Sequence, residues 1–154
     1  MGNNESLNPS PIKHNSDSTE QTVIESIVRT QLTEKLGIEF ITGIIELEGI
    51  SFQVDFYDET KFVYGEIFAR VGELKSGQKR KICMDILKLL TIEKLLGKPI
   101  KKYIVFTDKK IEEKFKSKTW YSKSILCFDL QIICINLTQE QQDLLKEVRK
   151  RQYR

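Results

Sequence analysis

Near residue 75 the hydrophobic pattern of the chain changes from that of β-strands to that of a long helix. On the N-terminal side, residues 38–48, 51–57 and 61–71 are rich in β-branched and aromatic side chains. Runs of this composition predict strands, and three in succession predict a β-meander. On the C-terminal side, residues 78–96 place apolar side chains at helical spacing and end at Gly97. A meander followed by a helix of this length is typical of a domain in which helices pack on a sheet.

The flanking segments extend the pattern on both sides. They predict a first helix, a buried strand, a basic helix or helix-loop, a second buried strand and a last helix that a Thr138–Gln141 capping box opens. In chain order these segments are residues 19–36, 101–107, 109–124, 130–137 and 138 onward. The order α-β-β-β-α-β-α-β-α predicts an α/β domain with a mixed central sheet.

The length of the chain sets its domain organisation. With 154 residues, it suits one domain, since domains most often have roughly 100–150 residues. Residues 1–17 contain too few apolar side chains to order themselves. We therefore expect a flexible tail over residues 1–17 and a single domain over residues 18–154.

Several classes of protein are excluded by what the chain lacks. No apolar run approaches the ~18 residues of a membrane span, and the polar first residues are unlike a secretory signal. The three cysteines form no C-x-x-C pair, which favours small buried side chains in a reducing compartment. The single histidine, His14, argues against His-based triads and most zinc sites. We expect a cytoplasmic protein that does not enter a membrane.

The small net charge of +3 hides an uneven distribution. Residues 1–69 carry 12 acidic and 4 basic side chains, whereas residues 70–118 carry 6 acidic and 15 basic ones. An acidic half followed by a basic half is what a polyanion-binding protein with an acidic site would show, although an ordinary solvated surface explains it equally well.

Two carboxylates on neighbouring strands form the main candidate site. Alternation places Phe52, Val54 and Phe56 on a core face of the second strand, so Asp55 points the other way. The same alternation in the third strand places Glu66 on the face opposite its core face. One hairpin register puts Asp55 opposite Tyr64 and another puts it directly opposite Glu66, and in both the two carboxylates share a face.

Adjacent carboxylates repel one another unless a positive charge lies between them. A hard divalent cation, Mg²⁺ or Mn²⁺, is one occupant that suits oxygen ligands. The alternative is a solvated pair bound to Lys or Arg. The following helix carries a polar stripe at i, i+3, i+7 and i+10, formed by Gln78, Lys81, Asp85 and Lys88. The stripe lies beside the apolar stripe of the same helix, so we expect its side chains to find partners in the protein, the two carboxylates among them.

This arrangement resembles the restriction-endonuclease-like PD-(D/E)XK superfamily, whose core is α-β-β-β-α-β. Asp55 matches the Asp of its second strand and Glu66 the acidic residue of its third strand. The Lys expected two residues later is Phe68 here, and the resemblance then implies Lys81 or Lys75 as its replacement, with Gln78 in a supporting role. Residues 65–90 also look like a group of small uncharacterised bacterial proteins with the pattern E-x-[FY]-A-x-x-G-x-L-K-x-x-Q-x-x-K-x-x-x-D-x-x-K-L.

The resemblance implies a Mg²⁺- or Mn²⁺-dependent phosphodiesterase, a DNA endonuclease-like hydrolase. Asp55 and Glu66 would be catalytic and hold the metal, and Lys81, Lys75 and Gln78 would complete the catalytic set. The nucleic acid would be bound by the basic side chains Lys79, Arg80, Lys88, Arg149, Lys150 and Arg151. Two alternatives stay open: a degenerate nuclease-fold module that binds nucleic acid or protein without cutting, and a regulatory subunit for an acidic protein partner. A homodimer also stays open, since no interface signature is found.

Overall fold

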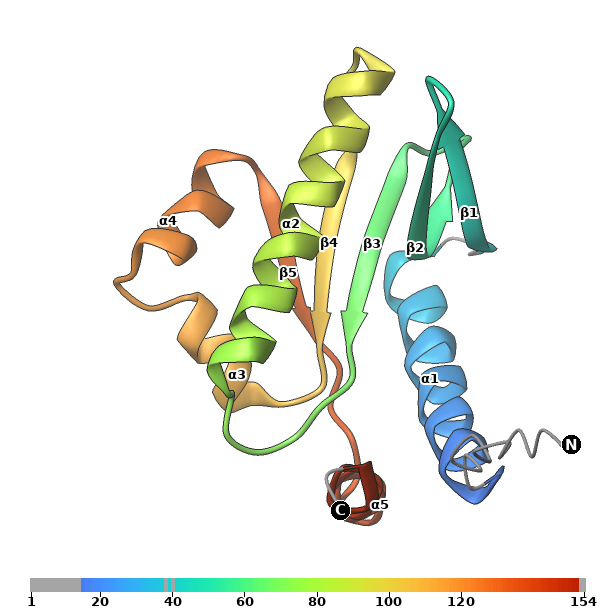
Figure 1. The fold of residues 1–154 in the computed structure, drawn as a ribbon, viewed down its shortest axis with the longest axis vertical. Coiled ribbons are helices and arrows are strands. Elements are labelled where there is room, and N and C mark those ends of the chain that lie inside the picture. Colours follow the sequence, from blue (N-terminus) through green and yellow to red (C-terminus); the bar gives the residue numbers. More distant parts are fainter. Residues whose placement is uncertain (1–14, 38, 40, 153–154) are drawn as a thin grey trace, which may run out of the picture.

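The structure is a computed structural model and describes residues 15–37, 39 and 41–152 (Figure 1). Its first helix begins at Asn15, so residues 15–17, which were predicted to belong to the tail, are helical. The rest of the predicted tail, residues 1–14, lies outside the described part, and it includes His14. The elements are α1 (Asn15–Leu36), β1 (Ile41–Leu47), β2 (Ile50–Asp58), β3 (Val63–Phe68), α2 (Ser76–Leu96), β4 (Lys101–Phe106), α3 (Lys109–Phe115), α4 (Trp120–Cys127), β5 (Leu130–Cys134) and α5 (Gln139–Gln152).

The described strands form a mixed five-stranded sheet in the order β1-β2-β3-β4-β5. The pairs β1–β2 and β2–β3 are antiparallel, whereas β3–β4 and β4–β5 are parallel. The predicted meander and the mixed α/β sheet are thereby confirmed. The strand predicted over 101–107 lies inside the sheet, as its apolar composition suggested. The strand predicted over 130–137 is shorter, because β5 ends at Cys134 and forms an edge.

Helices cover both faces of the sheet (Figure 1). One buried cluster, the α2-side core, joins residues of α2, α3 and α4 to the sheet, and the other, the α1-side core, joins residues of α1 and α5 to it. Phe52 and Val54 belong to the α2-side core, whereas Phe56 belongs to the α1-side core. The prediction of a single core face for these three side chains was therefore wrong.

A bulge in β2 explains the division. Ile41 of β1 pairs with Tyr57, but Gly43 pairs with Val54, so β2 contains one residue more than β1 across this interval. An extra residue bends a strand and changes which way the side chains on either side of it point. The bulge includes Asp55 and Phe56, and the sequence carries no glycine or proline there to signal it.

Close packing and caps fix the elements next to the bulge. A Cβ atom added to Gly65 would lie 2.0 Å from Cζ of Phe56, so the phenyl ring of Phe56 covers the backbone of β3 at a position that only glycine suits. Gly97 ends α2 with φ of 68°, as predicted. Thr138 and Gln141 exchange the two hydrogen bonds of the predicted capping box.

The basic segment after β4 forms two short helices, α3 and α4, which agrees with the helix-loop alternative. Asp108 caps α3 by accepting a hydrogen bond from the amide of Lys110, and Thr119 caps α4 in the same way through Ser122. Cys127 of α4 is exposed, contrary to the expectation that the cysteines are buried. Within the described residues, no helix is both long and apolar enough to span a membrane.

Candidate active site at the carboxyl end of β3

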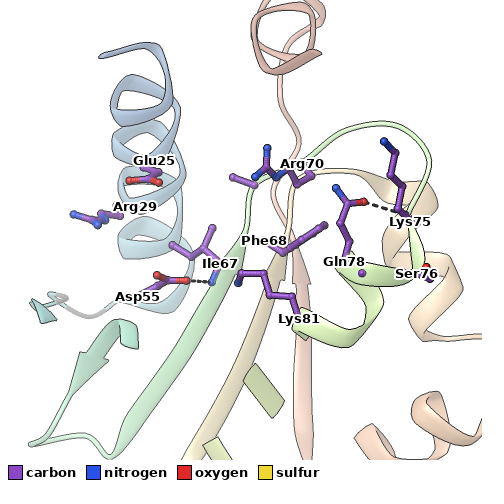
Figure 2. Close-up of a pocket in the computed structure, with 12 residues that line it drawn as sticks. Glu25, Arg29, Asp55, Ile67, Phe68, Arg70, Lys75, Ser76, Gln78 and Lys81 are labelled. Carbon is purple, nitrogen blue, oxygen red and sulfur yellow. Dashed lines mark hydrogen bonds between the residues drawn. The ribbon is translucent and has the colours of Figure 1, made fainter. Parts of the chain in front are cut away.

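A pocket of about 650 Å³ lies where β3 ends and α2 begins. Three walls form it: α1, the strands β2 and β3, and the first turns of α2 (Figure 2). Carboxyl ends of strands are where open α/β sheets commonly bind ligands. The lining includes four of the predicted site residues, Asp55, Lys75, Gln78 and Lys81, together with Glu25, Arg29, Ile67, Phe68, Ala69, Arg70, Ser76 and Gly77.

Asp55 lies at the bulge and is fixed by the backbone of β3. Its Oδ2 accepts a hydrogen bond of 2.7 Å from the amide of Ile67 (Figure 2). Backbone pairing between β2 and β3 ends one step earlier, at Phe56 and Gly65. Continued by one residue, this register places Asp55 opposite Glu66, which is the second of the two registers predicted from the sequence. The carboxylate of Asp55 therefore replaces a strand-to-strand hydrogen bond while it lines the pocket.

Glu66 lies behind Asp55, under α2. Only 4% of its surface is exposed, and its Oε1 is 2.5 Å from Nζ of Lys88. Burial raises the pKa of Glu66 to about 8, and a hydrogen bond and negative charge from Asp55 act in the same direction against the opposing effect of Lys88. The two carboxyl groups are thus close enough for Asp55 to raise the pKa of Glu66, and Lys88 does not offset this effect.

The polar stripe of α2 does face these carboxylates. Nζ of Lys88 contacts the carbonyl oxygen of Gln53 at 2.9 Å and the carboxylate of Asp85 at 3.5 Å. Lys81 binds the other oxygen of Asp85 at 2.8 Å, although the side chain of Lys81 is 57% exposed. Desolvation lowers the pKa of Lys88, but the hydrogen bond and charge of Glu66 outweigh it and raise the pKa overall. Lys88, predicted as a nucleic-acid contact, is thus half-buried and paired with Glu66.

The side chain of Gln78 caps the N-terminus of α2. Its Oε1 accepts a hydrogen bond of 3.0 Å from the amide of Lys75 (Figure 2). Its Nε2 is buried and has no hydrogen-bond partner. Lys75 itself is exposed at the rim of the pocket. Both residues therefore lie in the predicted site.

Phe68 occupies the position where the resemblance calls for Lys. The phenyl ring is 5% exposed and packs edge-on against Phe106, with ring centroids 6.3 Å apart. It forms part of the α2-side core as well as one wall of the pocket. A ring in this position offers no charge to a bound ligand.

Sequence reasoning missed two cationic side chains of the pocket, Arg29 and Arg70, and left Glu25 among three alternatives. Glu25 and Arg29 are four residues apart on α1, next to its buried apolar stripe, and that spacing was the available signal. Of the other two acidic residues considered in the first helix, Glu34 is exposed and absent from this pocket lining, and the side chain of Glu20 lies outside the described part.

The remaining basic side chains differ in their settings. Arg149 donates hydrogen bonds to the carbonyl oxygens of Val71 at 3.1 Å and Glu73 at 3.2 Å, and these bonds connect α5 to the loop after β3. Arg151 pairs with Glu147 on the surface of α5. Lys150 and Arg80 are exposed and Lys79 is half-buried.

The donor set suits a hard divalent cation. Mg²⁺ is commonly held by one or two carboxylates together with substrate oxygens. Asp55 and Glu66 provide two adjacent carboxyl groups, and burial together with the neighbouring Asp55 raises the pKa of Glu66 in spite of Lys88. Among the described residues no group of three or more His, Cys, Asp or Glu is arranged to hold a metal. A bound ion would therefore depend on these two carboxylates and on the substrate.

Comparison of the chain with models of protein families, with curated proteins and with solved structures gave no match.

Proposed function

We propose that the protein is a divalent-metal-dependent phosphodiesterase that hydrolyses the backbone of a nucleic acid in the β3 pocket. The observation that carries the proposal is the pair of neighbouring carboxyl groups of Asp55 and Glu66, on facing positions of β2 and β3, beside a pocket with four cationic side chains, Arg29, Arg70, Lys75 and Lys81. Local negative charge favours a metal ion, and the surrounding positive charge favours a polyanion.

The order of elements supports a restriction-endonuclease-like core within this proposal. The segments α1, β1, β2, β3, α2 and β4 follow the α-β-β-β-α-β order, with β1 to β3 antiparallel and β4 parallel to β3. Asp55 and Glu66 lie on the second and third strands of this unit. This supports the assignment through topology, independently of sequence similarity.

Asp55 and Glu66 would hold Mg²⁺ or Mn²⁺, which would polarise the scissile phosphate and lower the pKa of an attacking water. The chain itself supplies orientation and charge. The amide of Ile67 holds the Asp55 carboxylate in one orientation. Lys88 opposes the rise in the pKa of Glu66, which favours release of the proton when a metal ion binds, and Lys81 or Lys75 would offset negative charge on the phosphoryl oxygens.

The nucleic acid, which we take to be DNA, would pass over the opening of the pocket. Lys79 and Arg80 lie on the first turns of α2, beside the pocket-lining Gln78 and Lys81. Contacts of this type are dominated by phosphates and weaken steeply with salt. Lys150 and Arg151 at the end of α5 would add to the same electrostatic attraction.

The test is cleavage of single-stranded, duplex and branched DNA, and of RNA, by the full chain with Mg²⁺ or Mn²⁺. The informative variant is Asp55→Asn, since an amide oxygen can still accept the Ile67 hydrogen bond while the charge is removed. Glu59→Gln, which changes an exposed carboxylate in the turn after β2, is the matched control. We expect metal-dependent cleavage by the wild-type chain and by Glu59→Gln but none by Asp55→Asn. Absence of cleavage of every substrate by the wild-type chain would refute the proposal.

A second candidate is a nuclease-fold module that binds nucleic acid without cutting it. The specific observation in its favour is that Phe68 fills the usual Lys position with a core ring while Lys88 binds Glu66 from within. Salt-dependent DNA binding in a sample that fails to cleave with either metal would select this candidate. Failure to bind DNA at low salt would instead favour a protein-binding subunit.

A further inference from the structure

Two buried nitrogen atoms of the β3 pocket have no hydrogen-bond partner among the residues that the structure describes. They are Nε2 of Gln78 on α2 and Nε of Arg29 on α1, and both residues line the pocket. Most buried polar groups in proteins are hydrogen-bonded, and an unpaired one calls for an explanation such as a missing ligand. Both groups are donors, so the ligand that would satisfy them must carry acceptor atoms.

The orientation of the Gln78 amide is fixed by the hydrogen bond that its oxygen accepts. Oε1 accepts the hydrogen bond from Lys75, which leaves Nε2 as the group directed away from the helix start. In Figure 2 this nitrogen points towards the region of the pocket next to Arg70. A rotation that exchanged the two atoms would break the hydrogen bond to Lys75.

The charge of this side of the pocket is positive. Arg70 and Lys75 line it, and the first residues of α2, Ser76 and Gly77, contribute backbone at the positive end of a 21-residue helix. Lys81 lines the same pocket but is paired with Asp85. The two carboxylates in the lining, Glu25 and Asp55, come from α1 and β2, away from this end of α2 in Figure 2. On this side of the pocket the unpaired donor is Nε2 of Gln78, whereas Arg29 lies on α1 across the pocket. An unpaired donor together with positive charge selects an oxyanion.

We propose that the Gln78 side of the pocket is a phosphate-binding subsite, separate from the carboxylate pair. The role of this subsite rests on the proposed function: it would hold a second phosphate of the nucleic acid, next to the phosphate that is cleaved. The ligand chemistry is a phosphate group. Its source is either an internal phosphodiester or a terminal phosphate of the strand.

The test uses the full chain without divalent metal, so that binding is measured apart from cleavage. Inorganic phosphate is titrated and followed by calorimetry and by thermal stabilisation at constant ionic strength. Gln78→Glu keeps the acceptor for the Lys75 amide but replaces the donor by an anionic oxygen. Gln131→Glu, at an exposed position of β5, makes the same chemical change elsewhere. We expect binding to weaken by about tenfold or more in Gln78→Glu, as for loss of one charge-assisted hydrogen bond, and to be unchanged in Gln131→Glu.

The source of the phosphate is resolved with one oligonucleotide prepared with a 5′-phosphate, with a 3′-phosphate and with neither. If one terminal phosphate tightens binding to the wild-type chain and this gain is lost in Gln78→Glu, the subsite holds a strand end. If all three bind alike and Gln78→Glu weakens all three, it holds an internal phosphodiester. Equal binding of phosphate and oligonucleotides by wild-type and Gln78→Glu chains, or an equal loss in Gln131→Glu, overturns the subsite.

Failure of the subsite and failure of the proposed function give different results. Phosphate binding that depends on Gln78, in a chain that never cleaves with metal, leaves the subsite standing and removes the hydrolase. Metal-dependent cleavage with phosphate binding that Gln78→Glu does not alter removes the subsite and leaves the hydrolase. Asp55→Asn serves as a further comparison, since it should abolish cleavage but keep phosphate binding.

Discussion

The protonation of Glu66 makes the stability of the fold depend on pH in an unusual direction. Its pKa is about 8 in the folded protein, against the ordinary value of 4.5 that holds for the unfolded chain, chiefly because the carboxyl is buried. Between these values the folded state holds a proton that the unfolded chain has lost. Stability from this group is therefore complete below about pH 4.5 and is lost as the pH rises towards 8.

The size of the effect follows from the shift. Each pH unit in this window costs about 1.4 kcal/mol of unfolding free energy, so a rise from about pH 5.5 to pH 8 removes about 3 kcal/mol. For a domain of this size that is a fall in Tm of about 6–12 °C. His14 is the one histidine in the sequence, so few other groups titrate in the same window.

The assay is thermal and urea unfolding followed by circular dichroism at both pH values, without divalent metal. Glu66→Gln mimics the protonated carboxyl and retains an acceptor for Lys88, so it should remove most of the pH dependence. Asp55→Asn removes the neighbouring charge that raises the pKa of Glu66, and should shift the loss of stability to lower pH. Equal losses of stability in the wild-type and Glu66→Gln proteins between these pH values would refute the reasoning.

Three other substitutions test the framework around the site. Gly65→Ala should lower the free energy of unfolding in urea by about 1–3 kcal/mol, since the added Cβ meets the Phe56 ring. Truncating that ring should reduce the loss, and a Gly65→Ala protein as stable as the wild type would contradict the packing. Glu93→Ala should lower the free energy of unfolding by about 3–5 kcal/mol because it leaves the 2%-exposed Lys102 unpaired. Lys102→Met should lower it by less, since the 28%-exposed Glu93 side chain can be hydrated. A larger loss in Lys102→Met than in Glu93→Ala would contradict this reasoning. Arg149→Met should lower the free energy of unfolding by about 1–3 kcal/mol, because it removes the hydrogen bonds to Val71 and Glu73. The salt dependence of DNA binding should change little. A weaker salt dependence at unchanged stability would instead make Arg149 a phosphate contact.

The periodicity of the sequence was enough to predict the meander, α2 and the polar stripe of α2. These are local properties: the stripe needs only the spacing of Gln78, Lys81, Asp85 and Lys88, and spacing fixes the face of a helix. The nearness of Asp55 and Glu66 was also predictable, because one of the two registers considered for the hairpin places them opposite one another. The common core face assumed for the two strands was not, since Val54 packs in the α2-side core and Val63 in the α1-side core.

What the sequence could not provide depends on contacts between distant segments. The bulge at Asp55 follows from how β1 fits against β2, and nothing in the local residue types marks it. The approach of α1, which brings Glu25 and Arg29 to the pocket, depends on packing of α1 across the sheet. Lys88 was visible as part of the stripe, but whether its ammonium group meets solvent or Glu66 depends on the depth at which α2 packs.

Lys88 links stability to metal binding, and its replacement tests whether the site can be active. It contacts Glu66 from beneath α2, whereas Asp55 faces the pocket, so an ion bound from the pocket need not displace it. Lys88→Met should raise the pKa of Glu66 further above neutral, since a stabilising positive charge is removed. A metal ion must then displace a more tightly held proton, so Mg²⁺-dependent stabilisation and cleavage should weaken at neutral pH and partly recover in alkaline buffer, with Lys94→Met, an exposed change on the same helix, as the control. If Lys88→Met keeps the full Mg²⁺ response at neutral pH, Glu66 is not a ligand whose ionisation Lys88 supports.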